Sequence, residues 1–304
     1  MTKGSPTNIA ASVHARLMNL ARAEGRSFND LLQFYAMERF LYRLSRSDHA
    51  AKFVLKGALL LRVWNPGAYR TTRDIDLLGR MTSDVDAVAA AIASVCRERV
   101  AADGLEFDPE SVRGERIVED AEYEGVRVTF LGRLGNARVT MQIDVGFGDA
   151  VTPAPRQVDY PVLLDMPAPR LKAYPPETVI AEKFEVMLKR GDANSRMKDF
   201  HDIWWLARHR EFNGVMLAKA IRSTCAKRGT EIPARPTALS QAFAEDPAKA
   251  VQWRAFRRRL NPTSCPEDFA EVMAAVAEFV QPIAAAIAAG EPFERTWTPP
   301  GPWG

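Results

Sequence analysis

The strongest constraint on this chain is a pair of aspartates inside an apolar run, in the segment RDIDLLG from Arg73 to Gly79. The alternation of Asp74 and Asp76 with aliphatic residues predicts a strand, although aspartate is disfavoured in strands. Side chains of a strand alternate between its two faces, so both carboxylates share one face. Two like charges roughly 6–7 Å apart cost free energy unless a cation lies between them. A divalent metal ion provides that cation; the alternative is a solvent-facing edge strand whose polar residues happen to be aspartates.

A second strand-like segment, MQIDVGFGD, carries Asp144 between apolar neighbours. If its strand lies beside the first one, Asp144 adds a third carboxylate to the same face, and three such acids can hold two Mg²⁺ ions. An acid at the end of a strand is an equally good interpretation of Asp144. Gly57 ends the segment KFVLKG and precedes the helix-like ALLLRVW. A glycine here lets a triphosphate approach the backbone, and the helix N-terminus would offer its NH groups.

Helical and strand-like segments alternate in the first half of the chain and give way to helices in the second. Residues 8–47 have helical periodicity interrupted at Gly25, and strand-like runs and one helix follow up to Gly148. The proline-rich stretch after Gly148 indicates a linker, within which RQVDYPVLLD could form a short strand. We therefore expect a mixed α/β domain over residues 1–170, a helical domain over 171–290, and a Pro/Gly-rich tail over 291–304 that frays or drapes over the surface.

Composition excludes several classes of protein. With 304 residues, 47% of them hydrophobic and 26% charged, the chain has the composition of an ordinary globular protein. Its three cysteines lie far apart and its histidines do not cluster, which argues against a disulfide framework and a structural zinc site. We find neither a signal peptide nor an apolar stretch of the roughly 18 residues that span a bilayer. The expected location is cytoplasmic, with no membrane partner.

The helical half contains further charged candidates. Lys183 lies in an otherwise apolar helix segment, so its ammonium must reach a cleft, reach a partner such as a triphosphate, or snorkel to the surface. Asp199 and Asp202 are three residues apart and share one helical face. From the residues alone, one interpretation of this pair is a salt-bridge network with the neighbouring Arg196 and Lys198.

Basic residues flank the two elements that would face a nucleotide. Lys56 and Arg73 are placed to neutralise charge on the nucleotide or the acceptor. Arg70, with Thr71 or Thr72, would form the lip of the site.

A basic helix near the C-terminus is a candidate for RNA binding. In WRAFRRRL, Arg254, Arg257 and Arg258 lie near one helical face, with Trp253 and Phe256 close by. Cations beside aromatic rings suit contacts to RNA phosphates and stacking on bases. A merely solvated helix face is an equally good interpretation.

Taken in order, FVLKGALLLRVW…TTRDIDLLG, QIDVGFGD, AEKFEVML and RMKDFHDIWWL resemble the AbiEii/AbiGii (MenT-like) toxins of type IV toxin–antitoxin systems. The resemblance covers roughly residues 8–290. It implies a polymerase-β-like nucleotidyltransferase core, a mixed sheet with helices, and a C-terminal helical domain that completes the active cleft of a two-lobed molecule. The chain departs from the pattern at Ala58, where many members carry Gly or Ser, and in the longer gap between Gly57 and Asp74.

The resemblance also implies an activity: transfer of an NMP from an NTP to an RNA acceptor, at the tRNA 3′ end, which blocks translation. The implied partners are the NTP, a tRNA or other RNA, and a cognate antitoxin. The implied catalytic set is Asp74, Asp76, Asp144, Lys183, Asp199 and Asp202. The implied ligands of Mg²⁺, or of Mn²⁺, are Asp74, Asp76 and Asp144. The implied nucleotide-binding set is Lys56, Gly57, Thr72, Arg73 and Lys183. Two alternatives remain open: a nucleotide- or RNA-binding regulator without turnover, and transfer to a protein or small-molecule hydroxyl.

Overall fold

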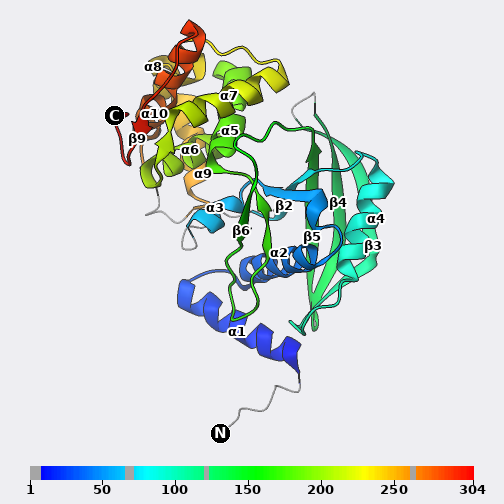
Figure 1. Cartoon of the computed structure of the whole chain (residues 1–304). Coiled ribbons are helices and arrows are strands. Elements are labelled where there is room, and N and C mark those ends of the chain that lie inside the picture. The colour runs from blue at the N-terminus through cyan, green and yellow to red at the C-terminus, as the bar shows by residue number, and fades with distance from the viewer. Residues whose placement is uncertain (1–7, 66–71, 120–122, 261–264) are drawn as a thin grey trace. The chain divides into compact units, whose positions relative to one another are not determined.

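The computed structural model describes residues 8–65, 72–119, 123–260 and 265–304 (Figure 1). The chain folds as two compact units. Up to Gly148 the described residues belong to the first unit, which also includes Gln157–Ala173. Asp149–Arg156 and Tyr174–Gly304 belong to the second unit. The chain thus passes between the two units more than once, whereas the sequence suggested a single boundary after residue 170.

A seven-stranded mixed sheet forms the first unit, with the strand order β3-β4-β5-β2-β1-β7-β6. The strands are β1 (Phe53–Lys56), β2 (Asp74–Gly79), β3 (Leu105–Glu119), β4 (Tyr123–Leu134), β5 (Ala137–Phe147), β6 (Arg156–Asp159) and β7 (Arg170–Ala173). β2 is antiparallel to β1 and parallel to β5, whereas β3, β4 and β5 form an antiparallel meander. The mixed α/β fold expected from the sequence is confirmed.

The first unit also contains helices, some of which pack on this sheet. They are α1 (Ile9–Glu24), α2 (Phe28–Arg46), the 3₁₀ turn η1 (Ala50–Lys52), α3 (Leu60–Trp64) and α4 (Val85–Cys96). α2 contacts β5, and α4 contacts β3 and β4. The side chains under them are fully buried, for example Ile75 and Leu77 of β2 with Ile143 and Val145 of β5. Because side chains alternate along a strand, the polar residues between these aliphatic ones lie on the opposite face.

The proline-rich segment after Gly148 is not the linker expected from its composition. It contains β6, within the RQVDYPVLLD stretch where a short strand was considered possible, and also β7, which pairs in parallel with β1. Two charged residues of α2 hold the segment in place: the Leu163 NH donates to Glu38 Oε2 at 2.7 Å, and Arg39 donates to the Pro167 carbonyl at 2.8 Å. Such anchors come from far away in the sequence, so local composition does not predict them.

The second unit is helical, as expected. It contains α5 (Pro176–Arg190), η2 (Gly191–Ala193), α6 (Met197–His209), α7 (Gly214–Arg228), η3 (Thr237–Leu239), α8 (Gln241–Glu245), α9 (Pro247–Arg257) and α10 (Phe269–Ala289). A two-stranded sheet joins β8 (Phe212–Asn213) to β9 (Thr296–Trp297).

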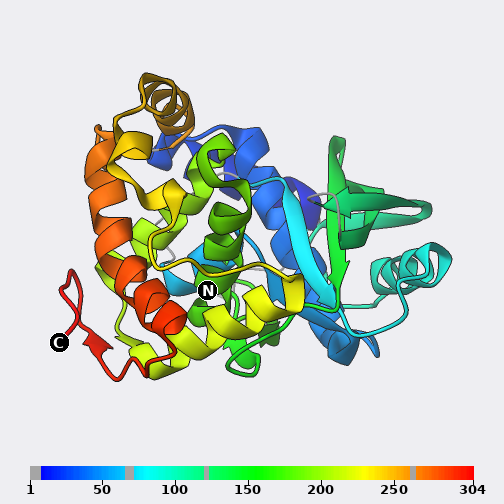
Figure 2. The same ribbon diagram turned by 90° about the horizontal axis from the view of Figure 1, so that it is seen from above.

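Of the two alternatives expected for the C-terminal tail, fraying and draping over the surface, fraying is not observed, because the tail packs against the helices of its own unit (Figure 2, red). Trp297 and Trp303 are both buried, and their indole NH groups donate to the carbonyls of Ala207 and Phe279 at 2.6 and 2.9 Å. The Trp303 ring also stacks on the Phe279 ring, with 5.5 Å between centroids. Proline and glycine predicted a loose end, but the burial of two tryptophans outweighs that tendency.

In the described part of the chain, α10 alone is long and apolar enough to cross a membrane, so the expectation that no such stretch exists was wrong. Length and composition are weak evidence here, because a core helix passes the same test. Phe269, Val276, Phe279 and Ile283 of α10 are buried inside the second unit. The structure therefore places α10 in the core of that unit.

The burial of Glu38 predicts that the stability of the protein depends on pH. Burial raises the pKa of Glu38 to about 7, against the opposing effects of Arg39, the Leu163 NH and Arg62. The native state thus retains a proton that the unfolded chain, with a carboxyl pKa near 4.3, releases, so the free energy of unfolding should fall as pH rises from about 4.5 to 7. In Glu38→Gln this fall should be smaller by roughly 1–3 kcal/mol. Urea unfolding at pH 4.5 and 7.5 measures it, and an equally steep fall in the variant would contradict the assignment.

Candidate active site

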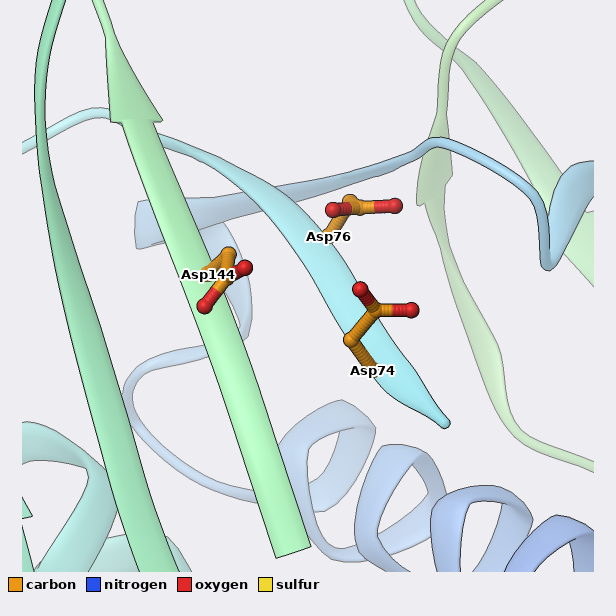
Figure 3. Close-up of side chains that lie close together, drawn as sticks. All are labelled: Asp74, Asp76 and Asp144. Carbon is orange, nitrogen blue, oxygen red and sulfur yellow. The ribbon is translucent and has the colours of Figure 1, made fainter. Parts of the chain in front are cut away.

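Three carboxylates gather on one face of the first unit's sheet, opposite the buried side chains of Ile75 and Ile143 (Figure 3). Asp76 lies directly beside Asp144 on the parallel neighbours β2 and β5, and Asp74 precedes it by two residues on β2. One oxygen from each of the three lies within 4.8 Å of the others. Carboxylate oxygens are the ligands that hard divalent cations prefer, so these residues fit a Mg²⁺ or Mn²⁺ ion.

Gly57 is adapted to this cluster. It follows β1 with a φ of 73°, in the left-handed region that favours glycine. A Cβ atom at this position would overlap the Asp76 carboxylate, which belongs to the strand paired with β1. Any other residue here would displace one of the three acids. The helix expected immediately after Gly57 is shorter than predicted: residues 57–59 form a turn, and α3 begins at Leu60.

Arg127 of β4 is a residue that the sequence interpretation missed. It faces Asp144 across the β4–β5 pair and donates from Nε and Nη2 to the two carboxylate oxygens, each at 2.8 Å. This hydrogen bond raises the pKa of Arg127 above its ordinary value. Gln142 Nε2 also donates to both oxygens, at 3.3 and 3.2 Å. Asp144, which is only 7% exposed, is therefore fixed from two sides.

The sequence did contain a signal for Arg127. β4 and β5 are joined by the two-residue turn Gly135-Asn136, a pair typical of β-hairpins. Counting outward from that turn pairs Leu134 with Ala137 and, further along, Arg127 with Asp144.

The other residues expected to bind the nucleotide differ in their exposure and in their contacts. The Thr72 hydroxyl is buried and donates to Asp74 Oδ1, so Thr72 supports one of the acids. Arg73 is exposed, and its carbonyl accepts from Gln33 Nε2 at 3.2 Å. Lys56 lies opposite Asp76 in the β1–β2 register. Arg70 and Thr71 lie outside the described residues.

A separate charged cluster lies within the second unit. Lys183 Nζ is 2.9 Å from Asp199 Oδ1 and 2.8 Å from Asp202 Oδ2, and Arg196 Nε is 2.6 Å from Asp199 Oδ2. Both acids are fully buried. Burial by itself raises the pKa of Asp199, but Lys183 and Arg196 outweigh it and hold that pKa below its ordinary range. Of the helix network considered from the sequence, the pair of Arg196 with Asp199 is present, and Lys183 joins both acids to it.

The proposed RNA-binding arginines of the second unit are not equivalent. Arg254 and Arg258 are exposed, whereas Arg257 is half-buried and its Nη1 lies 3.5 Å from Glu267. Phe256 on the same helix packs against the His201 ring, whose Nδ1 lies 3.1 Å from Asp202 Oδ1.

Comparison with known proteins identifies the family. Residues 39–275 match the model of the family described as nucleotidyl transferase AbiEii toxin, type IV TA system. The chain belongs to the AbiEii nucleotidyltransferase toxin family. The resemblance inferred from the sequence segments is thereby confirmed. Membership makes this AbiEii protein a nucleotidyltransferase and a toxin, and it implies an NTP donor and a cognate antitoxin.

A solved structure with the same fold supports this assignment. A crystal structure from H. pylori, described as a nucleotidyltransferase, matches with a TM-score of 0.50 at 15% identity, covering 86% of this chain and 98% of its own. JHP933 from Helicobacter pylori gives a TM-score of 0.48 at 14% identity, covering 94% and 97%. No curated protein matches the chain in sequence.

The charged cluster of the second unit predicts a strong effect on stability. Lys183→Met leaves the buried carboxylates of Asp199 and Asp202 without that cation, and removing one partner of a buried ion pair costs about 3–5 kcal/mol. Lys219→Met, which removes an exposed lysine of α7 in the same unit, should change stability by no more than about 0.5 kcal/mol. Thermal and urea unfolding of both variants provides the measurement. Equal stability of the two variants would show that the Lys183 ammonium does not compensate the buried acids.

Proposed function

We propose that this AbiEii toxin is a cytoplasmic enzyme that uses Mg²⁺, with Mn²⁺ as a substitute, to transfer an NMP from an NTP to the 3′ end of a tRNA. A tRNA modified at that end would no longer support translation. The observation that supports this proposal best is the convergence of Asp74, Asp76 and Asp144 on one face of the sheet. Family membership supports the reaction class, and the acceptor is inferred from the resemblance described above.

In the proposed reaction, the terminal hydroxyl of the acceptor attacks the α-phosphorus of the NTP. A new P–O bond forms, the bond to the β-phosphate oxygen breaks, and pyrophosphate leaves. Asp74 and Asp76 would hold the metal ion, and Asp144 would complete the ligand set and accept the proton of the attacking hydroxyl. A bound Mg²⁺ supplies charge neutralisation at the α-phosphate. Catalysis then depends mainly on positioning, to which the rigid Arg127–Asp144 pair contributes.

The remaining residues are assigned to binding. Gly57 leaves the backbone beside Asp76 free of a side chain, so a phosphate can approach it. Lys56 and Arg73 neutralise phosphate charge, and Thr72 orients Asp74.

The second unit is assigned supporting roles in the same reaction. Lys183 contributes to binding the triphosphate. Asp199 and Asp202 hold the Lys183 ammonium and support the position of the nucleotide.

RNA binding is assigned to Arg254, Arg257 and Arg258 of the second unit. Arg254 and Arg258 are the stronger candidates because they are exposed, whereas Arg257 lies near Glu267. Each arginine would contact a phosphate, and the contribution of each should weaken with added salt.

Nucleotide transfer is tested with purified protein, each α-³²P-labelled NTP, Mg²⁺, and a mixture of total RNA and cell protein. We expect label in tRNA for the wild type and a loss of about 10²-fold or more in Asp76→Asn, which removes a metal ligand. Asp86→Asn, at an exposed acid of α4, is the matched control and should retain activity. Asp76→Asn should not lower the melting temperature of the metal-free protein, because it removes one of several like charges.

The distribution of label separates the possible functions. Label in protein or in a small molecule would contradict the RNA acceptor while preserving the reaction class. No transfer by folded wild-type protein with any NTP would contradict catalysis and favour a binding regulator.

A further inference from the structure

The sheet face that carries the three acids continues along the β4–β5 hairpin toward the turn at Gly135-Asn136. The pairing of the two strands fixes which side chains share this face. On β4 and β5 they are Arg127, Thr129, Leu131, Arg133, Arg138, Thr140, Gln142 and Asp144. Apart from Asp144 itself, this track contains no acidic residue. It is a polar and cationic path that leads away from the proposed metal site.

Two arginines face each other at the far end of the track. Arg133 and Arg138 are directly opposite in the β4–β5 register, and both are exposed. Within the described residues, neither guanidinium group takes part in a hydrogen bond or an ion pair. Like charges directly opposite one another destabilise a strand pair. A bound anion would remove that repulsion.

Acids on β3 border this track on one side. Glu106 lies opposite Arg133, and Asp108 and Glu115 lie further along the same face. Arg113 of β3 donates to the carbonyls of Glu110 and Val112, at 2.9 and 2.7 Å, so part of its hydrogen-bonding capacity is already used. An acidic border along β3 would confine a polyanion to β4 and β5, the strands that lead to Asp144.

The distance between the two arginines and the acids indicates which kind of ligand could contact both. Arg138 and Asp144 are six residues apart on β5, a distance of about 20 Å at the rise of a β-strand. An NTP bound at the acids would not reach this pair of arginines. A polynucleotide whose 3′ end lies at the acids would reach it several nucleotides upstream of that end.

We propose that Arg133 and Arg138 form a binding site for the phosphate backbone of the polynucleotide acceptor, upstream of its reacting 3′ hydroxyl. This inference rests on the proposed RNA acceptor. Guanidinium groups bind phosphates through paired, charge-assisted hydrogen bonds, so two adjacent ones suit the backbone. Contacts to phosphates position a nucleic acid and do not read its bases, so the site selects for acceptor length and not for sequence.

The test compares a long and a short acceptor. In Arg133→Gln/Arg138→Gln, the KM for tRNA should rise about tenfold or more, with a smaller effect on kcat. Transfer to a trinucleotide with the same 3′ sequence should fall far less, because it is too short to reach the arginines. In filter binding, the slope of log K against log salt should decrease by about 1.5 for the two lost contacts.

Two further variants serve as controls. Arg16→Gln/Arg22→Gln removes the same charge from exposed positions on α1 and should leave tRNA binding and transfer unchanged. Arg133→Lys/Arg138→Lys retains the charge and should recover most of the salt slope. The free energy of unfolding of the glutamine variant should stay close to that of the wild type, because the variant loses both the repulsion between the arginines and the attraction between Arg133 and Glu106.

Several results would overturn this inference. If the slope of log K against log salt is the same in the double glutamine variant as in the wild type, the inference is wrong. This result counts even if the wild type labels no RNA, because filter binding requires no turnover. Equal losses on tRNA and on the trinucleotide would mean damage at the acids themselves. Normal transfer to both acceptors would refute the arginine site while leaving the proposed function intact.

Discussion

The burial of aliphatic side chains beneath β2 and β5 fixes the position of every acid at the site. Ile75 and Leu77 on β2, with Ile143 and Val145 on β5, are fully buried under the helices of the first unit. A shift of one residue in the pairing would move these side chains to the open face, so the register is strongly specified. The same register forces the intervening carboxylates together on the other side. The hydrophobic core thus offsets the cost of bringing like charges close together, and a bound cation would lower that cost further.

The acids at Asp199 and Asp202 differ in their surroundings from the three acids of the sheet. In the second unit, Asp199 and Asp202 each have a cation within 3 Å, so their burial is already compensated. In the first unit, three carboxylates converge on one point, and Arg127 is bound to Asp144 at the edge of the group. The convergence of three carboxylate oxygens suits the first unit's acids to a metal ion. For Lys183 to bind a triphosphate, it would have to share its ammonium between the ligand and its acidic partners.

Much of the site could be predicted because the relevant pattern is local. The alternation around Asp74 and Asp76 fixed their common face, and the apolar neighbours of Asp144 indicated a strand. Contacts between distant segments were harder to predict. Glu38 and Arg39 hold a proline-rich segment more than a hundred residues away, and two tryptophans bury a tail whose composition indicated a loose end. The Arg127–Asp144 pair joins two different strands but was still predictable, because counting residues outward from the hairpin turn pairs Arg127 with Asp144.

Anomalous diffraction from crystals grown with Mn²⁺ and a non-hydrolysable NTP analogue tests the central claim most directly. We predict a Mn²⁺ peak at a coordination distance of about 2.1 Å from oxygens of Asp74 and Asp76, with Asp144 completing the ligand set and the α-phosphate bound to the same ion. Crystals of Asp76→Asn should lose this peak. Nucleotide bound without Mn²⁺ at the three aspartates, or Mn²⁺ bound only elsewhere on the chain, would contradict the claim that this sheet face is the active site.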